Sequence, residues 1–368
     1  MNKKPKFALF ILCLALAGLA AELALRLAGF AFTPPPLRPP CLAAGSCGEA
    51  KAGLFENRRG TLSLKPEYYG WFNPQSFPAR KPAGEYRVFL FGGSTVYNLY
   101  GDTSKPFSEG GRNVRVINLG GNSFGLARLM PVFREALEYD PDLVLFYSGH
   151  NEFVDVVLGA MDDGDGGREK RAAKLRASRL YSLAEFAVYK AGMALMRLRK
   201  SGDTGLVRRF SVHLPEGTNK DKVYARYRGN LRAAAAEARA RGVAVRFCTL
   251  AYNRFIPPVS PPEAVETHRK GLELAAAGRH GEALALLNRG HEAEAIPYGA
   301  NETINRIIRE TAAETGVPLI DVDAAVSAVA PNGIPGFETF NDQCHYRDND
   351  AFWAVLRGAI ALSVGSGR

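Results

Sequence analysis

Two short motifs that are far apart in the 368-residue chain could supply a nucleophile and its base. Ser94 follows two glycines in the sequence Gly92-Gly93-Ser94-Thr95, directly after an apolar run. A serine on such a turn has an exposed hydroxyl, which needs a base before it can attack a carbonyl carbon. Among the six histidines, His345 has a carboxylate three residues earlier, at Asp342. This spacing lets the carboxylate orient the imidazole and stabilise its cation, so His345 is the candidate base.

The elements that must position these motifs alternate between strands and helices. The expected strands are residues 86–91, 114–118, 142–147, 243–250 and 317–322, and the expected helices are residues 124–139, 221–241, 301–315 and 350–362. Strands separated by helices predict a parallel sheet that is covered on both faces, an α/β fold. Ligands of such a sheet bind at the carboxyl ends of its strands.

Polar residues gather where three of these strands end. Ser94 follows the first strand, and Asn151 follows the third. Residues 118–123 comprise the last residue of the second strand and the loop after it. The Asp342 and His345 motif lies between the last strand and the last helix. We therefore expect these groups to meet at one edge of the sheet.

The order of these motifs resembles that of the SGNH (GDSL-like) hydrolase superfamily, over residues 66–362. The four similar blocks are Gly92-Gly-Ser-Thr95, Asn118-Leu-Gly-Gly-Asn-Ser123, Gly149-His-Asn-Glu152 and Asp342-Gln-Cys-His345. The resemblance implies a flavodoxin-like, three-layer α/β/α fold with a central parallel sheet and helical insertions. It also implies a catalytic triad of Ser94, His345 and Asp342 that needs no metal or cofactor.

The resemblance further implies an oxyanion hole made of the Ser94 amide, the Asn151 side chain and one amide of the second block. Family members usually have glycine five residues after the asparagine of that block, where this chain has Ser123. Since the contribution is a backbone N–H, Ser123 can donate it unless the site requires a positive φ. Gly121 is the competing donor. The third block ends in Asn-Glu where Asn-Asp is commoner, which leaves Asn151 intact.

The remaining histidines and cysteines have weaker claims. We expect His150 to shape the site beside Asn151, and we expect four histidines on the surface: His213, His268, His280 and His291. The sequence has no Cys-x-x-Cys or His-x-x-x-His pair, and no phosphate or dinucleotide loop, so no metal or nucleotide site is expected. Two disulfides are hypothesised, Cys41–Cys47 and Cys248–Cys344.

The N-terminus predicts export. Lys3, Lys4 and Lys6 precede residues 7–21, which carry no charge, as in a secretory signal. Because most positions remain apolar up to Phe32, residues 1–32 are either a signal peptide or a membrane anchor, and we favour the anchor. The lysines would stay cytoplasmic and the remainder would lie outside the cytoplasm. Residues 33–65, which contain Thr-Pro-Pro-Pro-Leu-Arg-Pro-Pro, are interpreted as a proline-rich linker.

Most of the net charge of +10 is local. Residues 168–209 contain twelve Lys and Arg against three acidic residues, interleaved with an apolar face. They lie in an expected insertion at residues 155–221, which could contact an anionic membrane or an acidic polymer, or could cover the core as a lid. Nucleic acid is disfavoured as a partner because the protein is expected to be exported.

A second insertion, residues 264–297, resembles one tetratricopeptide repeat. Its small and apolar residues include Gly271, Leu274, Ala283, Leu287 and Gly290. A single repeat cannot form a solenoid, so we expect a helical hairpin that packs on the hydrolase core. Some SGNH proteins carry such a hairpin.

The expected function is therefore that of an exported serine esterase or deacetylase. The substrate would be an acyl ester of a glycan or a lipid. Two alternatives remain open: a cell-envelope glycan O-acyltransferase that uses the same triad, and a catalytically idle envelope scaffold. The identity of the acyl group and the alcohol depends on loops that have no readable code.

Overall fold

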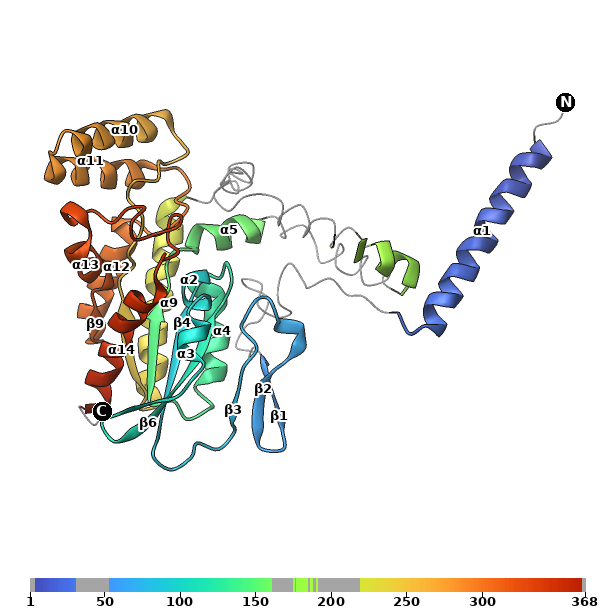
Figure 1. Ribbon diagram of the computed structural model, residues 1–368, viewed down its shortest axis with the longest axis horizontal. Helices are drawn as coiled ribbons and strands as arrows, with labels where there is room; N and C mark the ends of the chain where they lie inside the picture. The colour runs from blue at the N-terminus through green and yellow to red at the C-terminus, as the bar shows by residue number, and fades with distance from the viewer. Residues whose placement is uncertain are drawn as a thin grey trace. The chain divides into compact units, whose positions relative to one another are not determined.

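The computed structural model describes residues 4–30, 53–160 and 219–365, and residues 175, 177–184, 186, 187 and 190 between them (Figure 1). The chain divides into two compact units. One contains Met1–Leu37 and Met161–Asp203, and the other contains Arg38–Ala160 and Thr204–Arg368. All four sequence blocks lie in the second unit.

A six-stranded sheet forms the centre of the second unit. Its strands, in spatial order, are β5 (Phe107–Glu109), β6 (Arg112–Gly120), β4 (Glu85–Gly92), β7 (Leu143–Tyr147), β8 (Ala244–Cys248) and β9 (Leu319–Ile320). The last five are parallel, and β5 adds an antiparallel edge. Counted along the chain, the parallel strands lie in the order 2-1-3-4-5, which is the flavodoxin-like arrangement. The expected strands and fold class are confirmed.

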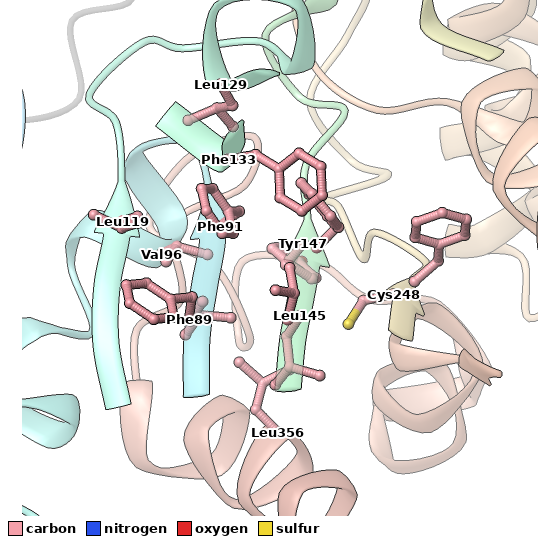
Figure 2. Close-up of a cluster of buried hydrophobic side chains, with 14 of the residues drawn as sticks. Phe89, Phe91, Val96, Leu119, Leu129, Phe133, Leu145, Tyr147, Cys248 and Leu356 are labelled. Atoms are coloured by element: carbon pink, nitrogen blue, oxygen red, sulfur yellow. The ribbon is translucent and has the colours of Figure 1, made fainter. Parts of the chain in front are cut away.

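Helices cover both faces of this sheet. Phe146 of β7 packs against Phe133, with ring centroids 5.3 Å apart, whereas the next residue, Tyr147, packs against Phe352 at 4.6 Å. Successive side chains of a strand point to opposite faces, so Phe133 and Phe352 belong to opposite helical layers. Figure 2 shows Phe133 and Tyr147 within the buried cluster around β4, β6 and β7.

Helices are present at the four ranges that the sequence predicts, and the sheet domain contains further helices outside those ranges. Those of the sheet domain are α2 (Ser94–Tyr97), α3 (Tyr100–Thr103), α4 (Leu126–Ala136), α5 (Glu152–Ala160), α9 (Lys220–Ala240), α12 (Glu302–Thr315), α13 (Val322–Val329) and α14 (Asn349–Gly365). The boundaries of α12 follow from local chemistry. Asn301 Oδ1 accepts the Ile304 N–H at 3.0 Å at its start, and Gly316 ends it at φ +69°.

A second, antiparallel sheet precedes β4. It consists of β1 (Phe55–Arg58), β2 (Thr61–Leu64) and β3 (Ser76–Pro78). Leu54, Leu62 and Leu64 are buried in the main hydrophobic cluster. The predicted linker at residues 33–65 is therefore too long at its C-terminal end. Residues 55–64 form β1 and β2, and alternate side chains of β2 are buried in the core.

The predicted helical hairpin is present as α10 (Pro262–Ala276) and α11 (His280–Ala293). The helices meet closely at glycines: a Cβ at Gly290 would lie 2.7 Å from the Cβ of His268. The two ends of the hairpin also meet, since the Ala295 N–H donates to the Ser260 carbonyl at 2.9 Å. Its relation to a tetratricopeptide repeat stays a prediction.

The first unit contains α1 (Lys4–Leu27). The carboxylate of Glu22 accepts the Arg179 and Leu180 N–H groups, each at 3.0 Å, where a helical segment begins. A helix able to cross a lipid bilayer is not found in the described part of the chain. Most of the predicted basic insertion lies outside the described residues.

Candidate active site

Ser94 begins α2 at the carboxyl end of β4, where two glycines allow close approach of other groups. A Cβ at Gly92 would lie 2.4 Å from the Tyr147 carbonyl oxygen. A Cβ at Gly93 would lie 2.3 Å from Asn151 Nδ2. The glycines therefore let β7 and the Asn151 amide lie against the backbone that precedes the nucleophile.

The predicted triad residues form a continuous chain of hydrogen bonds. His345 Nε2 lies 2.7 Å from Ser94 Oγ, and His345 Nδ1 lies 2.6 Å from Asp342 Oδ2. Because an ionised carboxylate only accepts, Nδ1 carries the proton and Nε2 is left to accept the Ser94 hydroxyl. This arrangement is the one in which histidine acts as the base for a serine.

Asp342 is itself held in place by the turn that it begins. Its Oδ1 accepts the N–H groups of Cys344 at 3.0 Å and of His345 at 2.9 Å. Partial burial raises the pKa of Asp342, but the bonds from His345 and from these two amides outweigh burial, and the net pKa lies below its ordinary value. Asp342 therefore remains ionised beside the imidazole.

The two candidate donors of the second block differ in their hydrogen bonds. The Gly121 N–H donates to the Gly92 carbonyl at 2.8 Å and so continues the ladder between β6 and β4. In the part of the chain that the structure describes, the N–H groups of Ser123 and Ser94 have no such partner. Ser123 is thus the second-block amide that can bind a developing oxyanion, together with the Ser94 amide.

Ser123 has φ +63°, in the left-handed region that favours glycine. Glycine would adopt this φ without steric cost. The backbone of the loop at residues 121–126 therefore does require a positive φ, and Ser123 adopts it. The structure leaves the N–H of Ser123 available in that conformation.

The Asn151 side chain lies between the nucleophile and this loop. Its Nδ2 donates to the Phe124 carbonyl at 3.1 Å and lies against Gly93. The following Glu152, where aspartate is commoner, accepts the Leu126 N–H through Oε1 at 2.9 Å. Burial, then the charge of Asp155, raises the pKa of Glu152 to about 8.

His150 is buried beside the triad. Its Nδ1 accepts the Ala300 N–H at 3.1 Å, which leaves the proton on Nε2. Burial, then the charge of His345, lowers the pKa of His150 to about 3, so the ring is neutral at physiological pH. His150 therefore joins the 294–301 segment that follows α11 to the active-site edge.

Two further contacts hold the blocks together. Thr95 Oγ1 donates to the Cys344 carbonyl at 3.4 Å and so connects the nucleophile turn to the Asp342–His345 turn. Asn118 Nδ2 donates to the Val96 carbonyl at 2.8 Å. Asn118 thus supports the backbone of α2.

Two charged residues beside the site were missed in the sequence. Arg128 and Asp155 form a buried ion pair, with Arg128 Nε 2.5 Å from Asp155 Oδ1. Arg128 lies on the polar side of a predicted helix, and Asp155 was assigned to the start of an insertion. The sequence shows only that a charged residue lies near the start of each helix. Surface helices commonly have such a residue, so it does not indicate a buried ion pair.

For two of the four histidines, the prediction of a surface position is wrong. His268 and His291, from α10 and α11, place their Nε2 atoms 2.8 and 3.3 Å from the Arg254 carbonyl oxygen. Packing of the hairpin on the core encloses both rings, and burial lowers both pKa values, to about 3 for His291. His280 is partly exposed, and His213 lies outside the described residues.

The hypothesised Cys248–Cys344 disulfide is also wrong. Both residues are free, buried thiols. Cys248 ends β8, whereas the Cys344 backbone bonds to Thr95 after β4, and β7 lies between these two strands. Burial raises the pKa of Cys344 to about 12. Cys41 and Cys47 lie outside the described residues.

Asp342, Cys344 and His345 also offer donor atoms that lie within 4.8 Å of one another, as metal ligands can. However, Asp342 and His345 use these atoms to bond each other. Burial, then the charge of Asp342, keeps the Cys344 thiol protonated, whereas a metal binds the thiolate. The group therefore fits a triad better than a metal centre.

No family model and no curated protein matches this chain. Its fold is similar to that of a GDSL-like lipase from Bacteroides thetaiotaomicron, with 11% identity over 79% of this chain and 93% of the other, at a TM-score of 0.39. It is also similar to an α/β hydrolase from the metagenome of Lake Arreo, with 11% identity, coverages of 76% and 95% and a TM-score of 0.37. An acetylxylan esterase from Geobacillus stearothermophilus is also similar, with 12% identity over 76% of this chain and 94% of the other, at a TM-score of 0.37. At these similarities, function has to be inferred from the geometry of the site itself.

Proposed function

We propose that the second unit is a serine hydrolase of the SGNH type that cleaves acyl esters through an acyl-enzyme. The observation that carries this proposal is the hydrogen-bonded chain Ser94–His345–Asp342 at the carboxyl edge of the sheet. The amides of Ser94 and Ser123, which have no hydrogen-bond partner among the described residues, support the same conclusion, as does the Asn151 side chain beside Gly93.

In the first half of the reaction, Ser94 Oγ attacks the acyl carbonyl carbon and its proton passes to His345 Nε2. The carbonyl π bond breaks, and its electron pair becomes the oxyanion, which the Ser94 and Ser123 amides and Asn151 would bind. Asp342 stabilises the imidazolium that forms. His345 then returns the proton to the alcohol oxygen as the ester bond breaks.

In the second half, water attacks the acyl-serine while His345 Nε2 accepts its proton. The new tetrahedral centre collapses, the carboxylic acid leaves and Ser94 regains its proton. A sugar hydroxyl could replace the water in this step, which would make the protein an acyltransferase. Measuring turnover with and without oligosaccharide acceptors separates the two outcomes.

The test of the hydrolase is the variant Ser94→Ala, with Ser108→Ala on the exposed edge strand as the control. We expect Ser94→Ala to lower the hydrolysis of p-nitrophenyl acetate by at least ~10³-fold with unchanged folding, because the nucleophile is gone. Ser108→Ala should retain wild-type activity. Equal turnover in wild type and Ser94→Ala would refute the assignment of Ser94 as the nucleophile. If the wild type shows no turnover, or if a fluorophosphonate does not label Ser94, the idle scaffold is favoured instead.

We further propose that residues 1–32 direct the protein out of the cytoplasm, either as a signal peptide or as an anchor. The support is the sequence pattern, in which Lys3, Lys4 and Lys6 precede an apolar run. Cell fractionation tests this proposal, and a cytoplasmic, full-length protein would contradict it.

A further inference from the structure

The backbone of the 121–126 loop is bonded by side chains at four consecutive residues. Arg128 Nη2 donates to the Ser123 carbonyl, and Asn151 Nδ2 donates to the Phe124 carbonyl at 3.1 Å. Asp155 Oδ1 accepts the Gly125 N–H at 3.0 Å, and Glu152 Oε1 accepts the Leu126 N–H at 2.9 Å. In the described part of the chain, the Ser123 N–H is left without such a bond.

The Arg128–Asp155 pair is the centre of this arrangement. The two side chains are 4% and 0% exposed, and one carboxylate oxygen of Asp155 contacts both Arg128 and the Gly125 amide. The Arg128 guanidinium also lies over the Phe124 ring, 4.3 Å from its centroid. A charge pair this deeply buried is costly to break, because removal of either side chain leaves the other charge uncompensated.

The fit of Asp155 against the loop is tight. A Cβ on Gly125 would lie 2.5 Å from Asp155 Oδ2 and 3.0 Å from the Asn151 carbonyl oxygen. The loop therefore has little room to turn. A serine at φ +63° would relax toward negative φ if nothing prevented it, and such a rotation would turn its N–H away.

We infer that Arg128 and Asp155 are positioning residues, which hold the Ser123 N–H in the direction of the oxyanion. Arg128 fixes the carbonyl of Ser123, and Asp155 fixes both Arg128 and the Gly125 amide two residues further on. The two backbone groups on the C-terminal side of Ser123 are thereby held, and the donor is preorganised. This inference rests on the proposed function.

The experiment compares an oxoester, p-nitrophenyl acetate, with its thionoester, in which sulfur replaces the carbonyl oxygen. Sulfur accepts hydrogen bonds more weakly than oxygen, so an aligned oxyanion donor favours the oxoester. The ratio of the two kcat/KM values therefore reports the alignment of the donors. A variant that merely loses folded protein lowers both values together and leaves the ratio unchanged.

The variants are Asp155→Asn, which keeps an acceptor for Gly125 but loses the charge, and Arg128→Lys, which keeps the charge but loses the planar fork. We expect kcat/KM for the oxoester to fall by about 10–100-fold, part of the 10²–10³-fold cost of removing an oxyanion donor. The oxoester-to-thionoester ratio should fall about 10-fold in both variants.

The matched control is Glu135→Gln. Glu135 is also buried and also accepts from two backbone amides, those of Leu54 and Phe55 at 2.7 and 3.0 Å, but at the start of β1 and not in the 121–126 loop. It should lower Tm and leave the ratio at its wild-type value. An unchanged ratio in folded Asp155→Asn and Arg128→Lys would overturn this inference alone. Wild-type protein without Ser94-dependent turnover would overturn the proposed function, and this inference with it.

Discussion

The two loops that meet at the active-site edge are held in place in opposite ways. The turn at residues 92–95 is fixed mainly by local backbone hydrogen bonds, with the Val96 and Tyr97 N–H groups donating to the Gly93 carbonyl at 3.1 Å. The 121–126 loop, after the neighbouring strand β6, is fixed by side chains from Arg128, Asn151, Glu152 and Asp155. One geometry is encoded locally, and the other depends on residues up to 30 positions away.

This difference decides which substitutions each loop tolerates. The turn needs glycine because other groups approach its Cα atoms directly. The loop needs a positive φ, but the side chains around it hold that conformation even with serine. A backbone conformation can thus be held by a short motif or by a buried network of charges.

Of the substitutions that test this comparison, Gly93→Ala in the locally encoded turn is expected to have the largest effect. Its methyl would displace the Asn151 amide, which lies 2.3 Å from the new Cβ position. We expect kcat for p-nitrophenyl acetate to fall ~10²–10³-fold, the cost of one oxyanion donor. Gly101→Ala is the control, because no atom lies within 4 Å of its Cβ position, and it should keep wild-type kcat. Full activity in Gly93→Ala would remove Asn151 from the oxyanion hole.

A smaller, pH-dependent effect is expected from Glu152→Gln, beside the 121–126 loop. Burial raises the pKa of Glu152 from 4.5 to about 8, so the folded state keeps a proton that the unfolded chain releases. The wild type therefore loses stability as pH rises from 4.5 to about 8, and the variant does not. Between these limits, the free energy of unfolding of the variant should rise relative to that of the wild type by at most about 5 kcal/mol, since each pKa unit is worth about 1.4 kcal/mol. Urea denaturation across this range measures it, and a constant difference would contradict the assignment.

The smallest effect is expected from Ser123→Gly. Glycine adopts the positive φ without steric cost, so the free energy of unfolding should rise by about 1 kcal/mol. Activity should not change, since the backbone N–H remains. Arg59→Gly, at φ +52° in the turn between β1 and β2, should give a similar gain far from the chemistry. A loss of activity in Ser123→Gly alone would assign a role to the serine hydroxyl.

Much of the fold and the proximity of Ser94, His345 and Asp342 could be predicted because their signals are local. Apolar runs define the five parallel strands, and Ser94 and the Asp342–His345 turn lie in contiguous motifs where strands end. The choice between Gly121 and Ser123 could not be predicted. It depends on which N–H the strand ladder uses and on the sign of φ, and neither can be read from residue types.

The errors have the same physical origin. The residue types around His268 and His291 do not reveal their burial, which results when α10 and α11 pack on each other and on the segment that carries Arg254. The roles of Arg128 and Asp155 exist because α4 and α5 meet behind a loop. The burial of β1 and β2 likewise depends on their contacts with the main hydrophobic cluster, which cannot be predicted from two four-residue strands.

The α10–α11 hairpin enters and leaves the core at two points that are one hydrogen bond apart, the Ser260 carbonyl and the Ala295 N–H. The entropy of closing a chain across such a gap rises only with the logarithm of its length, so a longer or shorter insert costs almost the same. The hairpin can therefore change in length while β8 and α12 keep their places. We expect related chains to differ in length here more than anywhere in the sheet, which an alignment of such chains will test.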